Sequence, residues 1–230
     1  MKLANSHGDA TLSSQITDTL RGAIVSGEIA PGSKISEPKL ANQLQVSRGP
    51  LREAIRRLEM MHLVRHVPHE GVRVVTLDRA QVMEIYQVRE ALEGMAAGLA
   101  AQNMSHSQID ELHQLLDVHE NYIRSNAGRY MQQEGDFDFH YKFIQASGNQ
   151  LLIQQLCGEL YHLIRMFRNQ GSQASGHSET ALQDHKQLVY AIERRDPQLA
   201  ELTVRHHIAR ARERISQRMQ GDDFSANTRN

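Results

Sequence analysis

The spacing of the apolar residues constrains this chain more than any other feature. Almost throughout, apolar side chains recur every three or four residues, which is the period of an amphipathic helix. The pattern changes once, between Leu63 and Val75, where valines predominate and Pro68-His69-Glu70-Gly71 interrupts them. This stretch predicts two short strands joined by a turn, and therefore a small β-hairpin in an otherwise helical protein.

Three helices are predicted before the hairpin. The first covers residues 11–25, and the second covers residues 36–44, after the turn at Pro31-Gly32-Ser33. Ser47 is the expected N-cap of the third. Its buried stripe consists of Leu51, Ala54, Ile55 and Leu58. Three helices followed by a hairpin are the parts of a winged helix-turn-helix, which we predict over residues 11–76.

From Asp78 onward the sequence predicts helices alone. We expect them over residues 79–101, 106–124, 128–146, 150–169, 178–194 and 197–219, with caps or helix breakers between them. The polar residues 221–230 are expected to form a frayed tail. The predicted fold class is therefore mainly α, with an N-terminal winged helix-turn-helix and a C-terminal all-helical antiparallel bundle over residues 80–219.

Composition excludes several classes of protein. With 230 residues, of which 40% are hydrophobic and 23% charged, the chain can bury two cores and is not composed like a disordered or collagen-like protein. Its one cysteine, Cys157, excludes an intrachain disulfide and a Cys-rich zinc site, and it suits a reducing compartment. No apolar run approaches the roughly 18 residues of a membrane helix. We therefore expect a cytoplasmic protein without a membrane partner.

Charge is unevenly distributed although the net charge is only −1. Residues 1–76 carry ten Lys and Arg against seven Asp and Glu, and the remainder carries sixteen against twenty. In the third helix, Arg48, Arg52 and Arg56 recur every four residues on a face distinct from the apolar stripe, as in a helix that reads the DNA major groove. By charge alone, a solvated helix face explains these arginines equally well.

The segments Ile35-Ser36-Glu37-Pro38-Lys39-Leu40-Ala41 and Val46-Ser47-Arg48-Gly49-Pro50-Leu51-Arg52-Glu53-Ala54-Ile55-Arg56-Arg57-Leu58 resemble the GntR family of bacterial transcription regulators. The resemblance extends over residues 12–218, and the helical remainder resembles the FCD effector domain of the FadR subfamily, in its VanR-like branch. It implies a set of DNA contacts, whereas Arg56 and Arg57 stay open to either interpretation. The implied contacts are Ser47, Arg48, Gly49, Arg52 and Gly71, the last at the tip of the hairpin.

The chain departs from the family pattern at three positions. Pro38 stands where the family often has Arg, so one DNA contact can be missing. Gln45, between the second and third helices, and His62, after the third, stand where the family often has Gly. These two residues are expected to adopt an uncommon backbone geometry or to shift the helix cap.

Three histidines and an aspartate in the helical half suggest a metal site. Asp136 and His140 are four residues apart on one predicted helix, and His185 and His207 each lie in an apolar stripe, so all three imidazoles are expected to point inward. A lone inward histidine is more often a hydrogen-bonded core residue, but helices of a bundle can bring such ligands together around Zn²⁺, or around Ni²⁺, Mn²⁺ or Fe²⁺. The resemblance to metal-binding FCD domains supports this set, and His206 competes with His207 for the last position.

Arg89 also falls on an inward face, and a guanidinium in a bundle interior needs an anion. One interpretation is an internal ion pair with Glu93 or another acid. The other, implied by the resemblance, is that Arg89 clamps the carboxylate of an effector that also reaches the metal. His162 and Arg165, three residues apart on one predicted helix, are candidates to line the same cavity.

The sequence therefore predicts a ligand-responsive DNA-binding regulator, a repressor rather than an enzyme. A small carboxylate would modulate its affinity for DNA, and it would act as a homodimer on an inverted-repeat operator in double-stranded DNA. Two alternatives remain at this point. One is a metal-dependent hydrolase, since such ligands can activate water, and the other is a bundle that the metal merely staples together.

Overall fold

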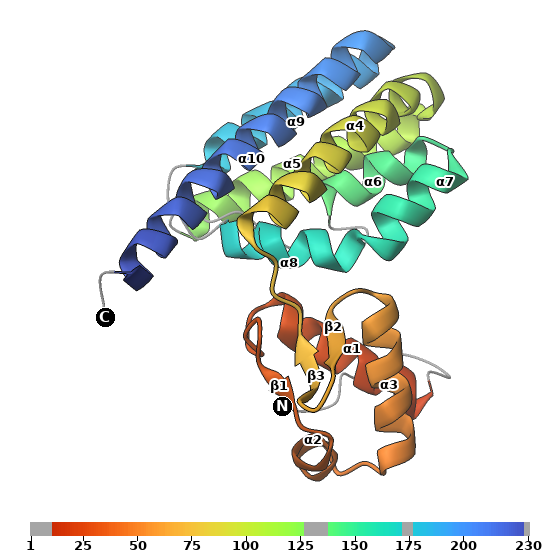
Figure 1. Cartoon of the computed structure of the whole chain (residues 1–230). Coiled ribbons are helices and arrows are strands. Elements are labelled where there is room, and N and C mark those ends of the chain that lie inside the picture. The colour runs from red at the N-terminus through yellow and green to blue at the C-terminus, as the bar shows by residue number, and fades with distance from the viewer. Residues whose placement is uncertain (1–10, 127–137, 172–176, 228–230) are drawn as a thin grey trace. The chain divides into compact units, whose positions relative to one another are not determined.

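The computed structural model describes residues 11–126, 138–171 and 177–227, most of which are helical (Figure 1). They form two compact units. One contains residues 11–76 together with Gly158–Gln170, and the other contains the rest of the described chain. The predicted fold class is confirmed: a winged helix-turn-helix comes first and a helical bundle follows. Among the described residues, no helix is both long enough and apolar enough to cross a membrane.

Three helices and a three-stranded antiparallel sheet make up residues 11–76. The sheet order is β1-β3-β2, and the register of the hairpin places Val64 opposite Val74. The predicted helices and hairpin are observed within a few residues of their expected bounds. The elements are α1 (Leu12–Val25), β1 (Lys34–Ile35), α2 (Glu37–Leu44), α3 (Arg48–Met60), β2 (Val64–Val67) and β3 (Gly71–Val74).

Helix α3 is fixed from one side by α1. Apolar side chains of the two helices are buried together, each contributing about 1.5–3 kcal/mol relative to an exposed one. Arg57 adds a polar tie, because its Nη1 donates a hydrogen bond of 2.9 Å to Ser14 Oγ on α1. The opposite face of α3 is left exposed. The buried residues that α1 and α3 contribute are Ile16, Leu20, Ile24, Leu51, Ile55 and Leu58.

The remaining helices follow the predicted order, with three corrections. The helices are α4 (Arg79–Asn103), α5 (His106–Ser125), α6 (Phe139–Ala146), α7 (Gln150–Ile153), α8 (Tyr161–Gly171), α9 (His177–Glu193) and α10 (Pro197–Asn227), with a π-helix at Gln154–Glu159. This π-helix interrupts the single helix predicted over 150–169. The helix predicted over 128–146 is observed only from Phe139, because Asp138 has an extended backbone and caps it. Finally, α10 continues past Gly221, where a frayed tail was expected.

Helices α4 and α5 begin where their caps dictate. The Asp78 side chain accepts a hydrogen bond from the Gln81 backbone, and the Gln81 side chain accepts one from the Asp78 backbone. Ser105 and Gln108 repeat this capping box at α5. These caps set the register of α4, and with it the direction in which Arg89 and Glu93 point.

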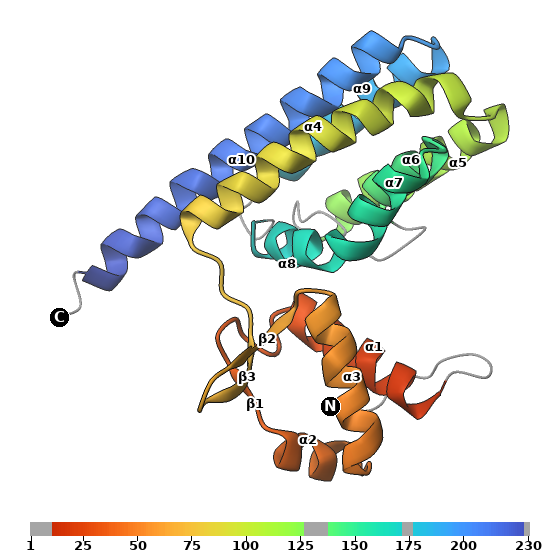
Figure 2. The same ribbon diagram turned by 45° about the vertical axis from the view of Figure 1, so that its right-hand side comes forward.

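Helices α4 and α10 lie side by side in both views of the bundle (Figures 1 and 2). Two glycines of α4 permit the close approach. A Cβ atom added at Gly94 would lie 2.9 Å from Cγ of Arg205, and one added at Gly98 would lie 3.2 Å from the carbonyl oxygen of Pro197. The pair therefore forms a closely packed platform that carries residues of the site described next.

Candidate nucleic-acid interface and metal centre

The N-terminal end of α3 presents the side chains that the sequence assigned to DNA. Ser47, Arg48, Gly49 and Arg52 are all exposed, while Leu51 on the other face is fully buried. Ser47 occupies the N-cap position with an extended backbone, but its side chain makes no capping hydrogen bond. A Cβ atom added at Gly49 would meet nothing within 4 Å, so the protein itself does not require glycine there. This end of α3 is free for a partner.

Arg52 is held in place by an acid of the neighbouring helix. Its Nε donates a hydrogen bond of 2.9 Å to Oε2 of Glu37, in the first turn of α2, and the arginine side chain remains 63% exposed. Arg56 is exposed, whereas Arg57 is bonded to Glu53 and Ser14 within the unit. The two arginines whose roles the sequence left open therefore differ in structure, and Arg57 serves packing.

The two departures from family glycines have the expected backbone consequence. Gln45 has φ 54° and His62 has φ 56°, both in the left-handed region that glycine adopts without steric cost. Gly71, at the tip of the hairpin, has φ 90°. The turns of this unit thus keep their geometry although two of them carry a side chain that disfavours it.

The second site is a cluster of three buried histidines on three helices. His140 on α6, His185 on α9 and His207 on α10 each offer a ring nitrogen, and these nitrogens lie within 4.8 Å of one another. The side chains are buried, as expected from their stripes, whereas His206 is exposed. Phe139, Phe143, Leu188 and Val204 line the same small cavity. The structure therefore brings together three of the four predicted ligands.

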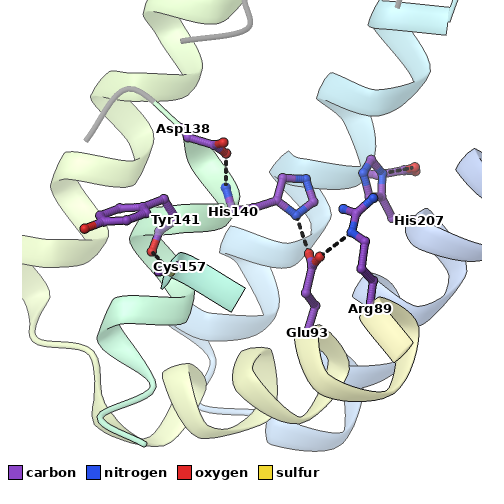
Figure 3. A network of polar contacts seen from close by, with 8 residues as sticks. Arg89, Glu93, Asp138, His140, Tyr141, Cys157 and His207 are labelled. Atoms are coloured by element: carbon purple, nitrogen blue, oxygen red, sulfur yellow. Dashed lines mark hydrogen bonds and ion pairs between the residues drawn. The ribbon is translucent and has the colours of Figure 1, made fainter. Parts of the chain in front are cut away.

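Two carboxylates orient two of these rings. Oε2 of Glu93 lies 2.6 Å from Nδ1 of His140 (Figure 3). Oδ2 of Asp184 lies 3.0 Å from Nδ1 of His207. Burial alone would raise the pKa of Glu93, but Arg89 and His140 hold that pKa far below its usual range. Burial also raises the pKa of Asp184, and His207 and Arg210 outweigh it. Both carboxylates are therefore ionised and can only accept, so each ring donates from Nδ1. In a neutral ring this leaves the lone pair on Nε2.

This arrangement fits a borderline divalent cation. Burial lowers the pKa of His207 to about 4, so that imidazole is neutral at pH 7. Neutral imidazoles whose other ring nitrogen is bonded to a carboxylate are the usual donors to Zn²⁺ and related ions. His207 meets that description, and His140 makes the same contact between Nδ1 and a carboxylate. His185 lies between Phe139, stacked at 4.2 Å between ring centroids, and the other two rings.

Arg89 faces the bundle interior and forms the internal ion pair that the sequence left open. Its Nε donates to Oε1 of Glu93 at 2.7 Å, and both side chains are 2% exposed. Its guanidinium carbon lies 4.9 Å from the ring centroid of Tyr86. Within the described part of the chain, this is the only hydrogen bond that the guanidinium makes. Its two Nη groups therefore remain as donors for a ligand, so the ion pair and the clamp are compatible.

The roles of three other predicted site residues are not tested by the structure. Asp136 lies outside the described residues, and its role stays a prediction. His162 and Arg165 lie on α8, within the first compact unit, where the Arg165 guanidinium lies 5.6 Å from the ring centroid of Tyr161. Their part in the effector site stays a prediction as well.

Sequence reasoning did not assign a role at the metal site to Glu93 or Asp184. Glu93 was considered only as a partner of Arg89. The available signal was an acid four residues from an inward arginine, and an acid beside an inward histidine. Their contacts with His140 and His207 join different helices, so helical spacing does not reveal them.

Comparison with known proteins also divides the chain into two parts, except that residues 158–170, which cluster with the first compact unit, fall within the second match. The gntR family of bacterial regulatory proteins matches residues 12–74, and the FCD domain matches residues 84–210. The chain is 29% identical over 199 residues to a probable D-xylose utilization operon transcriptional repressor of Paenarthrobacter nicotinovorans, covering 86% of each. It is 28% identical over 214 residues to the transcriptional repressor RspR of Escherichia coli, covering 91% of this chain and 92% of that protein. The solved structure of E. coli McbR/YncC shares the fold, with a TM-score of 0.67 at 22% identity over 93% of this chain and 99% of that one.

Proposed function

Because the chain belongs to the GntR family of bacterial transcription regulators and carries an FCD domain, we propose that it is a repressor whose affinity for its operator is set by a small organic acid. The family and its relatives are transcription regulators and not enzymes, which removes the hydrolase alternative. Two of the relatives are named as repressors, which favours repression here. We assign the DNA-binding domain to residues 11–76 and the effector domain to residues 80–219.

DNA binding is assigned to the exposed start of α3 and the tip of the hairpin. Ser47, Arg48, Gly49 and Arg52 would enter the major groove, where arginine forms two hydrogen bonds with guanine, and Gly71 would approach the adjacent backbone. A single recognition helix covers one half-site. We therefore propose a homodimer on an inverted repeat, since a two-fold protein matches a two-fold operator.

The effector domain is proposed to hold one divalent cation, with zinc as the first choice and Ni²⁺, Mn²⁺ or Fe²⁺ as alternatives. His140, His185 and His207 would be ligands together with Asp136. A bound cation would offer open coordination positions to carboxylate oxygens. Arg89 would bind the same carboxylate through its Nη groups, and His162 and Arg165 would contact the rest of the molecule. The buried histidine cluster beside Arg89 is the observation that carries this proposal.

Regulation follows if the acid binds one arrangement of the bundle more tightly than another. The ligand then shifts the population between arrangements by its difference in affinity, and the DNA-binding domains follow. We expect the acid to release DNA.

The experiment is a fluorescence-anisotropy titration of the full-length, zinc-loaded protein against an operator selected from random duplex DNA. D-gluconate, D-glucuronate, citrate and benzoate are added in turn, and at least one is expected to lower the affinity. An Arg89→Met variant that binds the operator but ignores the acid supports the clamp. If chelation lowers the melting temperature while no carboxylate changes operator affinity, the metal only staples the bundle and the sensor proposal fails.

A further inference from the structure

The carboxylate of Glu93 serves two partners at once. Oε1 accepts from Nε of Arg89 at 2.7 Å, and Oε2 accepts from Nδ1 of His140 at 2.6 Å (Figure 3). Arg89 and Glu93 share α4, whereas His140 comes from α6. All three side chains are buried, so water does not replace either contact. Glu93 therefore joins the arginine proposed to bind the effector to a histidine proposed to bind the metal.

We propose that Glu93 is a positioning residue that couples these two halves of the site, because the same carboxylate orients the guanidinium of Arg89 and fixes the tautomer of His140. The inference rests on the proposed function in taking Arg89 as the clamp and His140 as a ligand. With the hydrogen on Nδ1, the lone pair of His140 is on Nε2 and can face a cation.

An amide in place of this carboxylate cannot accept from each partner through a separate oxygen, as Glu93 does. Glutamine has one acceptor oxygen and one donor NH2 group, whereas Arg89 and His140 each bring a donor. Arg89 cannot reverse its role, because a guanidinium only donates. The amide oxygen should therefore turn to Arg89, and the NH2 group should then force His140 to accept at Nδ1. The ring hydrogen moves to Nε2, which removes the lone pair from the metal side.

Asp184 provides a matched control at the other histidine. It accepts from Nδ1 of His207 through Oδ2, and from Arg210 through Oδ1. Its second partner, however, has a side chain that is 50% exposed, so Arg210 can turn to water if Asp184 becomes an amide. The same chemical change should therefore disturb His207 less than it disturbs His140.

The experiment compares wild type, Glu93→Gln and Asp184→Asn in the full-length protein. Long-range 1H–15N correlation spectra of the metal-free protein report the tautomer of each ring, with His140 assigned from its absence in a His140→Asn variant. We expect the hydrogen of His140 on Nδ1 in wild type and on Nε2 in Glu93→Gln. Zinc affinity, measured by competition with a chelating dye, should fall about ten- to a hundredfold in Glu93→Gln and less in Asp184→Asn.

A double variant, Arg89→Met with Glu93→Gln, keeps the test decisive if the single variant folds poorly. It removes both buried charges. The amide oxygen can then accept a hydrogen bond from His140, because Arg89 no longer competes for it. The Nδ1 hydrogen and most of the zinc affinity should return. The inference is overturned if Glu93→Gln keeps the wild-type tautomer and binds zinc within twofold of wild type, or if the double variant restores neither. If wild type binds no zinc while Glu93→Gln still changes the tautomer of His140, the metal centre is refuted and the control of His140 by Glu93 stands.

Discussion

Two arginine–glutamate pairs in this protein have nearly the same geometry and opposite surroundings. Arg52 and Glu37 lie 2.9 Å apart at the DNA-reading surface with 63% and 31% of their side chains exposed, whereas Arg89 and Glu93 lie 2.7 Å apart in the bundle with 2% exposed. Water screens the first pair, so it orients a side chain and adds little stability. The second pair has lost its hydration and depends on both members. The exposed arginine of the proposed DNA-binding surface can thus exchange its partner for DNA, while the proposed effector site must keep its buried charges matched.

The largest difference between the two pairs is expected when the arginine is removed from each. Arg89→Met leaves Glu93 buried with one donor fewer, and the free energy of unfolding should fall by about 3–5 kcal/mol. Arg52→Met should leave the unfolding midpoint unchanged. Urea denaturation followed by circular dichroism measures both. Equal midpoints for the two variants would show that the buried pair contributes no more to stability than the exposed pair.

Metal binding should depend on the buried region alone. His185→Ala removes one proposed ligand, so zinc affinity should fall more than a hundredfold, beyond the loss expected for a residue that only orients a ligand. His206→Ala is the control, because His206 is exposed on the same helix as His207. Elemental analysis of the dialysed proteins provides the measurement. Unchanged zinc content in His185→Ala would exclude this residue as a ligand.

Without effector, DNA affinity should depend on the exposed arginine pair. Arg52→Ala should weaken operator binding about ten- to a hundredfold, which is the range for loss of a good contact between arginine and a base. Glu37→Gln frees Arg52 from its tether without removing it, so a smaller loss is expected. Anisotropy titrations at fixed salt compare the two variants. Wild-type affinity in Arg52→Ala would place this residue outside the interface.

The smallest effect concerns the strained turns of the DNA-binding unit. Gln45→Gly and His62→Gly should each stabilise the protein by up to about 1 kcal/mol, because glycine adopts the left-handed backbone without steric cost. Gln43→Gly, two residues earlier and inside α2, should instead destabilise by about 1 kcal/mol. Thermal melts distinguish the signs. Destabilisation by all three changes would show that the left-handed turns carry no strain.

The order of helices and the position of the hairpin follow from the sequence because apolar spacing reports them directly. Strand β1 escaped prediction because its two residues, Lys34 and Ile35, are too few to show alternation. The π-helix at Gln154–Glu159 escaped because Leu152, Leu156 and Leu163 keep an apolar spacing that also suits one continuous helix. A π-helix shifts the backbone hydrogen bonds by one residue relative to an α-helix, and this local change leaves little trace in the amino-acid composition.

The candidate site could likewise be predicted only as far as the spacing within each helix allows. His140, His185 and His207 each lie in an apolar stripe, so their burial could be inferred one helix at a time. The pairing of Glu93 with His140 could not be inferred in that way, because the residues are 47 positions apart on helices whose relative rotation is set by packing. Directions within a helix can therefore be read from the sequence, whereas contacts between helices require the fold.

The close packing of α4 against α10 at Gly94 and Gly98 limits how the bundle can respond to a ligand. Sliding α4 along α10 would drive each helix backbone into side chains or a carbonyl of the other, so we expect the two helices to move as a single body. That body carries Arg89 and His207, and four residues separate the start of α4 from the end of β3. Spin labels placed on α4 and α10 should thus keep a constant separation when ligand is added, while the orientation of the pair against α6 changes.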